Sequence, residues 1–196
     1  KYAAEDLDCI ISCSISRRID SRYHFEPTMS ILIKNDLGAQ QAMNFDISNA
    51  CAGMLTGVYV LDSLIRSGAV QNGMVLSGER NYAGSETAER EIDSIFHEQF
   101  ASLTVGDAAT AVILDDCGTE EETLSMVELM TCAEPADLCL GMPSLETPGV
   151  ALYTKNIKLH AATNLQLWPY MAKKVFEEAG SSIEDENFDY LIPHQI

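Results

Sequence analysis

The stretch "NFDISNACAGMLTGVYVLDSLIRSG" (Asn44–Gly68) decides the fold, because it joins a strand pattern directly to a helix pattern. Residues 42–48 alternate between apolar and polar side chains, which predicts a strand. From Cys51 onward, apolar residues recur with a period near 3.6, which predicts a helix. Residues 73–79 predict the next strand. A strand, a helix and a strand in succession form a βαβ unit with parallel strands and a right-handed crossover.

The rest of the chain continues this alternation of strands and helices. Strands are predicted at 7–16, 123–131 and 190–194, and within 103–116 after a glycine turn and small residues. Helices are predicted at 158–179 and at 29–38, where a strand is the alternative, and loops at 17–28 and 132–150. Residues 81–101 are charged and predict a helical insertion on the surface. The pattern as a whole predicts an α/β protein. The acidic linker 117–122 is the best internal boundary, and it divides the chain into 1–116 and 117–196.

The composition excludes several classes of function. The chain has 196 residues, with 30 acidic against 12 basic side chains and a formal net charge of −18, which argues against nucleic-acid or anionic-membrane binding through a basic face. No apolar run reaches the ~18 residues that a membrane span needs, and no secretory signal opens the sequence. The six cysteines form no CxxC pair and lack zinc-finger spacing. We therefore expect reduced thiols, no metal and a cytoplasmic location.

Cys51 is the first candidate functional residue. A cysteine in the first turn of a helix, here one capped by Ser48 or Asn49, lies near the positive end of the helix dipole and near free backbone N–H groups. Both favour the thiolate, which is the nucleophilic form. The pattern alone leaves open whether Cys51 is a nucleophile or a small buried residue. The residues around it are small and leave space for a substrate: Ala50, Ala52 and Gly53.

His194 is the second candidate, in "LIPHQ" at the end of an apolar strand pattern. The carboxyl ends of strands carry functional groups in α/β sheets. A cysteine and a histidine far apart in sequence can meet as nucleophile and base, or as nucleophile and oxyanion donor. An ordinary loop histidine remains the alternative.

Four blocks in order carry a resemblance to a known family. "FDISNACAG", "IRSGAVQNGMVLSGE", "VGDAATAVIL" and "YLIPHQ" together resemble the thiolase superfamily, and within it β-ketoacyl-acyl carrier protein synthase III. The resemblance spans nearly the whole chain. It implies the five-layered αβαβα thiolase-like fold, a homodimer, and two similar halves that are incomplete at both ends of this chain. Residues 1–116 would belong to the first half and 117–196 to the second.

The resemblance also implies a reaction. Cys51 would take an acyl group from acyl-CoA, and malonyl-acyl carrier protein would then lose carbon dioxide to give a carbanion that attacks the acyl group. His194 would stabilise the enolate, and the backbone N–H of Cys51 would hold the oxyanion. The product would be a β-ketoacyl chain for fatty acid or related biosynthesis. No metal or separate cofactor is implied, since coenzyme A arrives with the substrate. The family's catalytic Asn and a glycine-rich stretch would lie beyond Ile196, and its opening elements before Lys1.

Glu26 favours a variant of this chemistry. The stretch "HFEPT", 25 residues before Cys51, and the charged insertion 81–101 resemble the head-to-head branch, which joins two fatty acyl chains from coenzyme A into a β-keto acid. There a glutamate reaches the partner's site as a base, which is needed because no decarboxylation makes the carbanion. A solvated loop carboxylate is the alternative for Glu26. Two other functions stay open for the chain, a non-catalytic thiolase-fold partner subunit and a hydrolase that releases the acyl group to water.

Overall fold

The computed structural model describes residues 2–19, 22–119, 122–131, 133, 136–159 and 161–194. Two compact units make up the chain: unit 1 is Lys1–Asn81 with Asp107–Leu129, and unit 2 is Tyr82–Gly106 with Met130–Ile196. The helices and strands of unit 1 are η1 (Ala4–Asp6), β1 (Cys9–Ser12), β2 (Arg18–Ile19), β3 (Arg22–Tyr23), α1 (Met29–Leu37), β4 (Met43–Asp46), η2 (Ala50–Ala52), α2 (Gly53–Arg66), β5 (Asn72–Glu79) and β6 (Ala108–Asp115).

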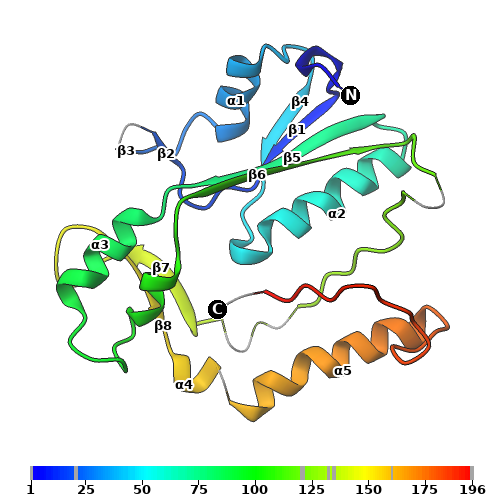
Figure 1. Cartoon of the computed structure of the whole chain (residues 1–196). Helices are drawn as coiled ribbons and strands as arrows, with labels where there is room; N and C mark the ends of the chain where they lie inside the picture. Colours follow the sequence, from blue (N-terminus) through cyan, green and yellow to red (C-terminus); the bar gives the residue numbers. More distant parts are fainter. Residues whose placement is uncertain are drawn as a thin grey trace. The chain divides into compact units, whose positions relative to one another are not determined.

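A four-stranded sheet with the order β4-β1-β5-β6 forms the centre of unit 1 (Figure 1). β4 and β5 both run parallel to β1, whereas β6 runs antiparallel to β5. The predicted βαβ unit is therefore confirmed, but its two strands flank β1 instead of pairing with each other. The mixed sheet with helices on both faces is the α/β arrangement that the sequence predicts.

The two helices of unit 1 cover opposite faces of this sheet (Figure 1). Because side chains alternate along a strand, Cys9 and Ile11 of β1 face α2, and Ile10 faces the α1 side. The predicted helix at 29–38 is confirmed, and Gly38 ends it with a left-handed φ of 77°. Two separate apolar cores thus hold the sheet between α1 and α2.

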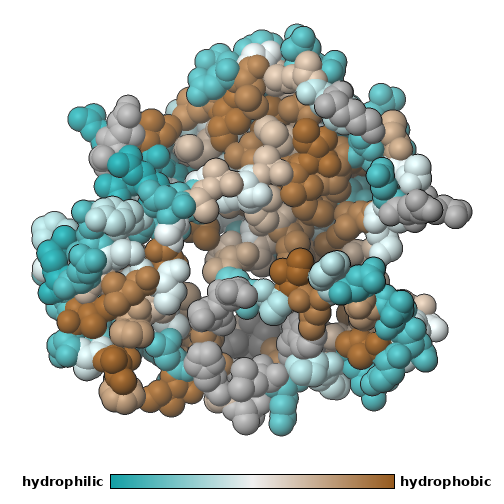
Figure 2. Space-filling model, in the orientation of Figure 1, coloured by the Kyte–Doolittle hydropathy of each residue, from teal (hydrophilic) through white to brown (hydrophobic). Residues whose placement is uncertain are grey.

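The outer side of α2 is apolar as well. Leu55, one of the apolar residues that recur with the helical period, is 64% exposed, and Tyr59 one turn later is 42% exposed. Figure 2 shows apolar side chains gathered over unit 1 in this view. A helix that is apolar on both sides is typical of a buried layer rather than of a surface helix.

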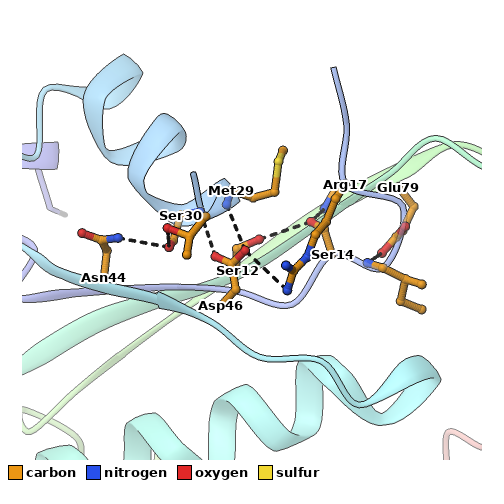
Figure 3. A network of polar contacts seen from close by, with 11 residues as sticks. Ser12, Ser14, Arg17, Met29, Ser30, Asn44, Asp46 and Glu79 are labelled. Carbon is orange, nitrogen blue, oxygen red and sulfur yellow. Dashed lines mark hydrogen bonds and ion pairs between the residues drawn. The ribbon is translucent and has the colours of Figure 1, made fainter. Parts of the chain in front are cut away.

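Asp46, at the end of β4, fastens the start of α1 to the sheet (Figure 3). Its carboxylate accepts hydrogen bonds from the backbone N–H groups of Met29 and Ser30, both at 2.9 Å, and lies 3.7 Å from Arg17 Nη2. Thr28 is the N-cap residue, but its side chain makes no cap hydrogen bond. A carboxylate from a distant strand therefore caps α1.

We expect Asp46→Asn to reduce the free energy of unfolding by about 1–2 kcal/mol, because it removes the charge at the helix N-terminus and one of two acceptors. Urea unfolding measures the loss, and faster hydrogen exchange at the amides of Met29 and Ser30 locates it. Asp36→Asn, at an exposed position of the same helix, is the matched control. Equal stability of the two variants would contradict this role.

Glu79 fastens the loop that follows β1. Its carboxylate accepts hydrogen bonds from the backbone N–H groups of Ile15 at 2.7 Å and Ser16 at 2.9 Å. Glu79 also lies at the end of β5, beside β1 in the sheet. It therefore stabilises the edge of the sheet at which the strands β1, β4 and β5 end.

Unit 2 is built from α3 (Tyr82–Glu91), η3 (Phe100–Thr104), β7 (Cys139–Pro143), β8 (Val150–Thr154), α4 (Asn156–Leu159) and α5 (Ala162–Glu178). β7 and β8 form an antiparallel hairpin, and α3 and η3 pack against β8. The helix predicted at 158–179 is confirmed as α5, with Pro169 inside it. No described helix has the length and apolar character that crossing a bilayer requires.

Three predictions in the second part of the chain are wrong. The described residues of 123–131 and 190–194 form no strand, and β7 lies inside the predicted loop 132–150. An apolar run forms a strand only where another strand accepts and donates its backbone hydrogen bonds. Among the described residues, none pairs in this way with 123–131 or 190–194. The predicted boundary after residue 116 concerns the halves of a complete fold and stays a prediction.

Candidate active site

Cys51 lies in a 3₁₀ turn, η2, between the end of β4 and the start of α2. Its thiol is exposed. The sequence predicts the first turn of a helix here, and the structure places Cys51 two residues before that helix begins. The predicted side-chain cap is wrong, since Asn49 instead donates from Nδ2 to Thr56 Oγ1 at 2.7 Å. The position at the carboxyl end of a parallel strand is confirmed.

The residue before the thiol is held in an unfavourable backbone conformation. Ala50 has a φ of 44°, and it is the only non-glycine residue with positive φ in the described ranges. Such a conformation costs of order 1 kcal/mol or more for a residue with a Cβ, and it concentrates at functional sites. The hydrogen bonds Ile47 N–Ser12 O at 2.9 Å and Ala52 N–Asn49 O at 3.0 Å fix the turn on both sides. The chain therefore tolerates strain in order to present Cys51.

Two glycines bring α2 against the sheet directly after Cys51. A Cβ at Gly53 would lie 3.2 Å from the backbone oxygen of Cys13, and a Cβ at Gly57 would lie 2.5 Å from Val75 Cγ1. The small size of Gly53 thus serves the packing of α2 on β1, whereas the sequence indicates space for a substrate. The close approach fixes the start of α2, and with it the position of Cys51.

Glu26 lies in unit 1, on the segment between β3 and α1. Its side chain is exposed, and it follows Phe25, which is 86% exposed. No hydrogen bond or ion pair joins Glu26 to Cys51 in the part of the chain that the structure describes. Asp46, however, contacts or adjoins the segments of both residues. Asp46 caps the helix that begins after Glu26 and ends the strand that leads to Cys51.

His194 belongs to unit 2 and is exposed. The residues before it, Tyr190 to Ile192, are between 73% and 90% exposed and form no strand. Gln195, the next residue of the "PHQ" block, lies outside the described residues. Because the two units are described separately, the pairing of His194 with Cys51 stays a prediction.

The comparisons with known proteins agree on one family. The family model for 3-oxoacyl-[acyl-carrier-protein] synthase III matches residues 45–132. β-Ketoacyl-[acyl-carrier-protein] synthase III of Clostridium novyi is 26% identical over 203 residues, which cover 98% of this chain and 56% of the relative. The same enzyme of Sphingopyxis alaskensis is 29% identical over 175 residues, which cover 86% of this chain and 50% of the relative.

Solved structures agree on the fold. Xanthomonas campestris OleA with bound lauric acid and lauroyl-CoA has a TM-score of 0.72 and 23% identity, and the match covers 93% of this chain and 53% of that chain. A priming β-ketosynthase of a polyketide biosynthetic pathway has a TM-score of 0.65 and 18% identity, covering 93% of this chain and 52% of that one. The chain is similar in sequence to synthase III proteins. It has the thiolase-like fold of these neighbours and spans about half the length of the curated relatives it matches.

One buried carboxylate was not predicted from the sequence. The charged residues 81–101 are predicted to lie on the surface, but Glu91 is only 8% exposed. It accepts hydrogen bonds from the Thr147 hydroxyl, the Gln99 amide and the Ser144 hydroxyl, the last at 2.8 Å. These bonds, with Thr147 first, lower the pKa of Glu91 to about 2. The buried Thr87 and Ala88 one turn earlier show the inward face, a helical pattern that the sequence does contain.

The lowered pKa of Glu91 implies that the free energy of unfolding depends on pH in the acidic range. Its folded-state pKa of about 2 lies below the ordinary value of 4.5, so its contribution to stability is fully present above about pH 4.5 and is lost as the pH falls towards 2. We expect Glu91→Gln to flatten the fall in the free energy of unfolding between these pH values. Urea unfolding at several pH values measures this. An unchanged slope in the variant would contradict the assignment.

The described cysteines differ in burial. Desolvation raises the pKa of both Cys9 and Cys13 to about 11, with further contributions from the Asp8 and Asp46 carboxylates respectively. Cys51, Cys117 and Cys139 are exposed. At pH 8 we therefore expect iodoacetamide to label these three within minutes and to leave Cys9 and Cys13 unlabelled until the protein unfolds. Peptide mass spectrometry measures this, and early labelling of Cys13 would contradict the structure of β1.

Proposed function

We propose that the enzyme to which this chain belongs forms a carbon–carbon bond by Claisen condensation, with Cys51 as the acyl acceptor. The observation that carries the proposal is the exposed Cys51 at the end of β4, preceded by the strained Ala50 and followed by the closely packed start of α2. In the first step the thiolate of Cys51 attacks the carbonyl carbon of an acyl-CoA. Coenzyme A leaves as the thiol, and the acyl group remains on Cys51 as a thioester.

The second step forms the new bond. Malonyl-acyl carrier protein loses carbon dioxide, and the electron pair left on its α-carbon attacks the acyl carbonyl on Cys51. The cysteine leaves as a thiolate, and a β-ketoacyl-acyl carrier protein is released. We propose that His194 donates a hydrogen bond to the thioester oxygen of the second substrate, which stabilises the negative charge of the enolate. The names of the relatives support this version, since they are synthases of the same type.

A head-to-head condensation of two acyl-CoA molecules is the second candidate. OleA structures with a replaced cysteine, glutamate or histidine give the spacing of these residues. The interval between Glu26 and Cys51, and that between Cys51 and His194, each differ by one residue from the OleA intervals. In this reaction Glu26 of a second copy of the chain would reach the site of Cys51 and remove the α-proton of the second acyl-CoA. No carbon dioxide would form.

Product analysis on the full-length enzyme distinguishes these reactions. Carbon dioxide released in equal amount to the ketone, with malonyl-acyl carrier protein present, supports the decarboxylative reaction. Ketone formed from acyl-CoA alone, lost in Glu26→Gln but kept in the exposed control Glu5→Gln, supports the head-to-head reaction. Release of coenzyme A without any ketone would overturn both in favour of a hydrolase. If neither ketone nor free coenzyme A forms, the result would indicate a non-catalytic partner subunit.

A further inference from the structure

Glu91, Gln99, Ser144 and Thr147 form a polar cluster in unit 2, the Glu91 cluster, and one of its buried polar atoms has no partner among the described residues. Gln99 is fully buried, and its Nε2 donates to the carboxylate of Glu91. This bond fixes the orientation of the amide, because the reverse orientation would set two oxygens against each other. The amide oxygen, Gln99 Oε1, then has no hydrogen-bond partner among the described residues. A buried carbonyl oxygen of this kind costs of order 1–3 kcal/mol unless a water or an ion satisfies it.

The same cluster contains a buried charge that no described residue pairs with an opposite charge. Glu91 is 8% exposed, and no Lys, Arg or His of the described ranges forms an ion pair with it. Glu91 is also the last residue of α3, where the carbonyl groups of the helix add negative partial charge. The hydrogen bonds from Thr147, Gln99 and Ser144 keep the carboxylate ionised at neutral pH. A buried charge is usually paired with an opposite charge or with a metal ion.

We propose that a monovalent cation, Na⁺ or K⁺, binds at this cluster, with the Glu91 carboxylate, Gln99 Oε1 and Thr147 Oγ1 as protein ligands. The ligand atoms are all oxygen, which suits hard cations. The cluster supplies one negative charge, and the described residues contain no group of three or more His, Cys, Asp or Glu side chains that could hold a metal ion. A single positive charge therefore balances the site. The Thr147 hydroxyl donates a hydrogen bond to Glu91, so the lone pairs of its oxygen remain available to a cation.

The cation would join three segments of unit 2, of which the turn with Thr147 is distant in the sequence from the other two. Glu91 ends α3, Gln99 precedes η3, and Thr147 lies in the turn between β7 and β8. The backbone N–H of Thr154, at the end of β8, donates to the backbone oxygen of Glu98, next to Gln99, at 2.7 Å. Among the buried residues here, Thr87, Glu91, Gln99, Ser102 and Thr154 are polar. The proposed ion would add an electrostatic contact among the Glu91, Gln99 and Thr147 side chains.

Thermal unfolding of the full chain in different salts tests the site. Matched solutions of 200 mM KCl, NaCl and choline chloride have equal ionic strength, so screening of the −18 net charge is the same in all three. For a dissociation constant of about 10 mM, the bound ion raises the ratio of folded to unfolded chain about 20-fold. We expect the unfolding midpoint in KCl or NaCl to lie about 4 °C or more above that in choline chloride.

Two variants locate the effect. Glu91→Gln should abolish the difference between the salts, whereas Glu89→Gln, which removes the same charge from an exposed position of the same helix, should keep it. Equal midpoints in the three salts for the wild type would overturn the proposal, and would leave a buried water as the partner of Gln99. A salt difference that survives in Glu91→Gln would overturn it as well.

A crystal of the unmodified chain grown in rubidium or thallium salt provides a test that needs no variant. We expect an anomalous peak between Glu91 and Gln99 Oε1. A water without anomalous signal at that position would overturn the proposal.

Discussion

Replacing Cys51 by alanine in the full-length enzyme is expected to reduce formation of the β-keto product by at least about 10³-fold. Without the thiol no acyl-enzyme can form, and the second substrate has no bound acyl group to attack. The backbone of η2 tolerates alanine, since Ala50 and Ala52 flank the site in the same turn. The variant should therefore fold with unchanged stability, so that the loss of product reflects chemistry.

Cys117→Ala is the matched control, because Cys117 is a second exposed cysteine of unit 1. We expect it to keep the activity of the wild type within about twofold. Product analysis by mass spectrometry with a panel of acyl-CoA substrates measures both variants. Activity of Cys51→Ala within about tenfold of the wild type would show that another residue accepts the acyl group.

Replacing Gly57 by valine is expected to lower the free energy of unfolding by about 3 kcal/mol. A Cβ at this position would lie 2.5 Å from Val75 Cγ1 and 2.7 Å from Cys13 Sγ, both in the core between α2 and the sheet. The methyl groups of valine would force the helix away from β1 and β5. Because Cys51 directly precedes this helix, we also expect slower acylation of Cys51 in Gly57→Val under conditions in which the variant is still folded.

Gly78→Val provides the comparison within the same unit. Gly78 lies in β5, and a Cβ there would meet no atom within 4 Å. Valine favours strands, so this change should alter stability by about 0.5 kcal/mol or less. Urea unfolding compares the two variants, and equal destabilisation would contradict the close packing of α2.

The sequence predicted unit 1 well because its elements are locally consistent. Alternation marks β4, a 3.6-residue period marks α2, and Gly38 ends α1 as predicted. The order of the strands was not predictable in this way, since β1 inserts between β4 and β5 through contacts distant in sequence. The strand patterns at 123–131 and 190–194 failed for a related reason. A strand depends on a neighbour that its own sequence does not contain.

In the candidate site, too, the features set by local sequence were predictable and those set by tertiary contacts were not. Cys51 could be found from its place between a strand and a helix, and the structure adds the strain at Ala50, which no sequence pattern reveals. Asp46 was visible only as a residue of the strand, and its role as the cap of α1 depends on tertiary contact. Glu91 was hidden among acidic neighbours, because one buried carboxylate among exposed ones leaves little trace in composition.

The measurement that tests the central claim most directly is intact-protein mass spectrometry of the full-length enzyme after incubation with acyl-CoA substrates of several chain lengths. We predict one added acyl group on the wild type, mapped by peptide analysis to Cys51, and none on Cys51→Ala. The preferred chain length would further separate a short starter from a long fatty acyl chain. An acyl group on a different residue, or no adduct with any acyl-CoA, would contradict the assignment of Cys51 as the nucleophile.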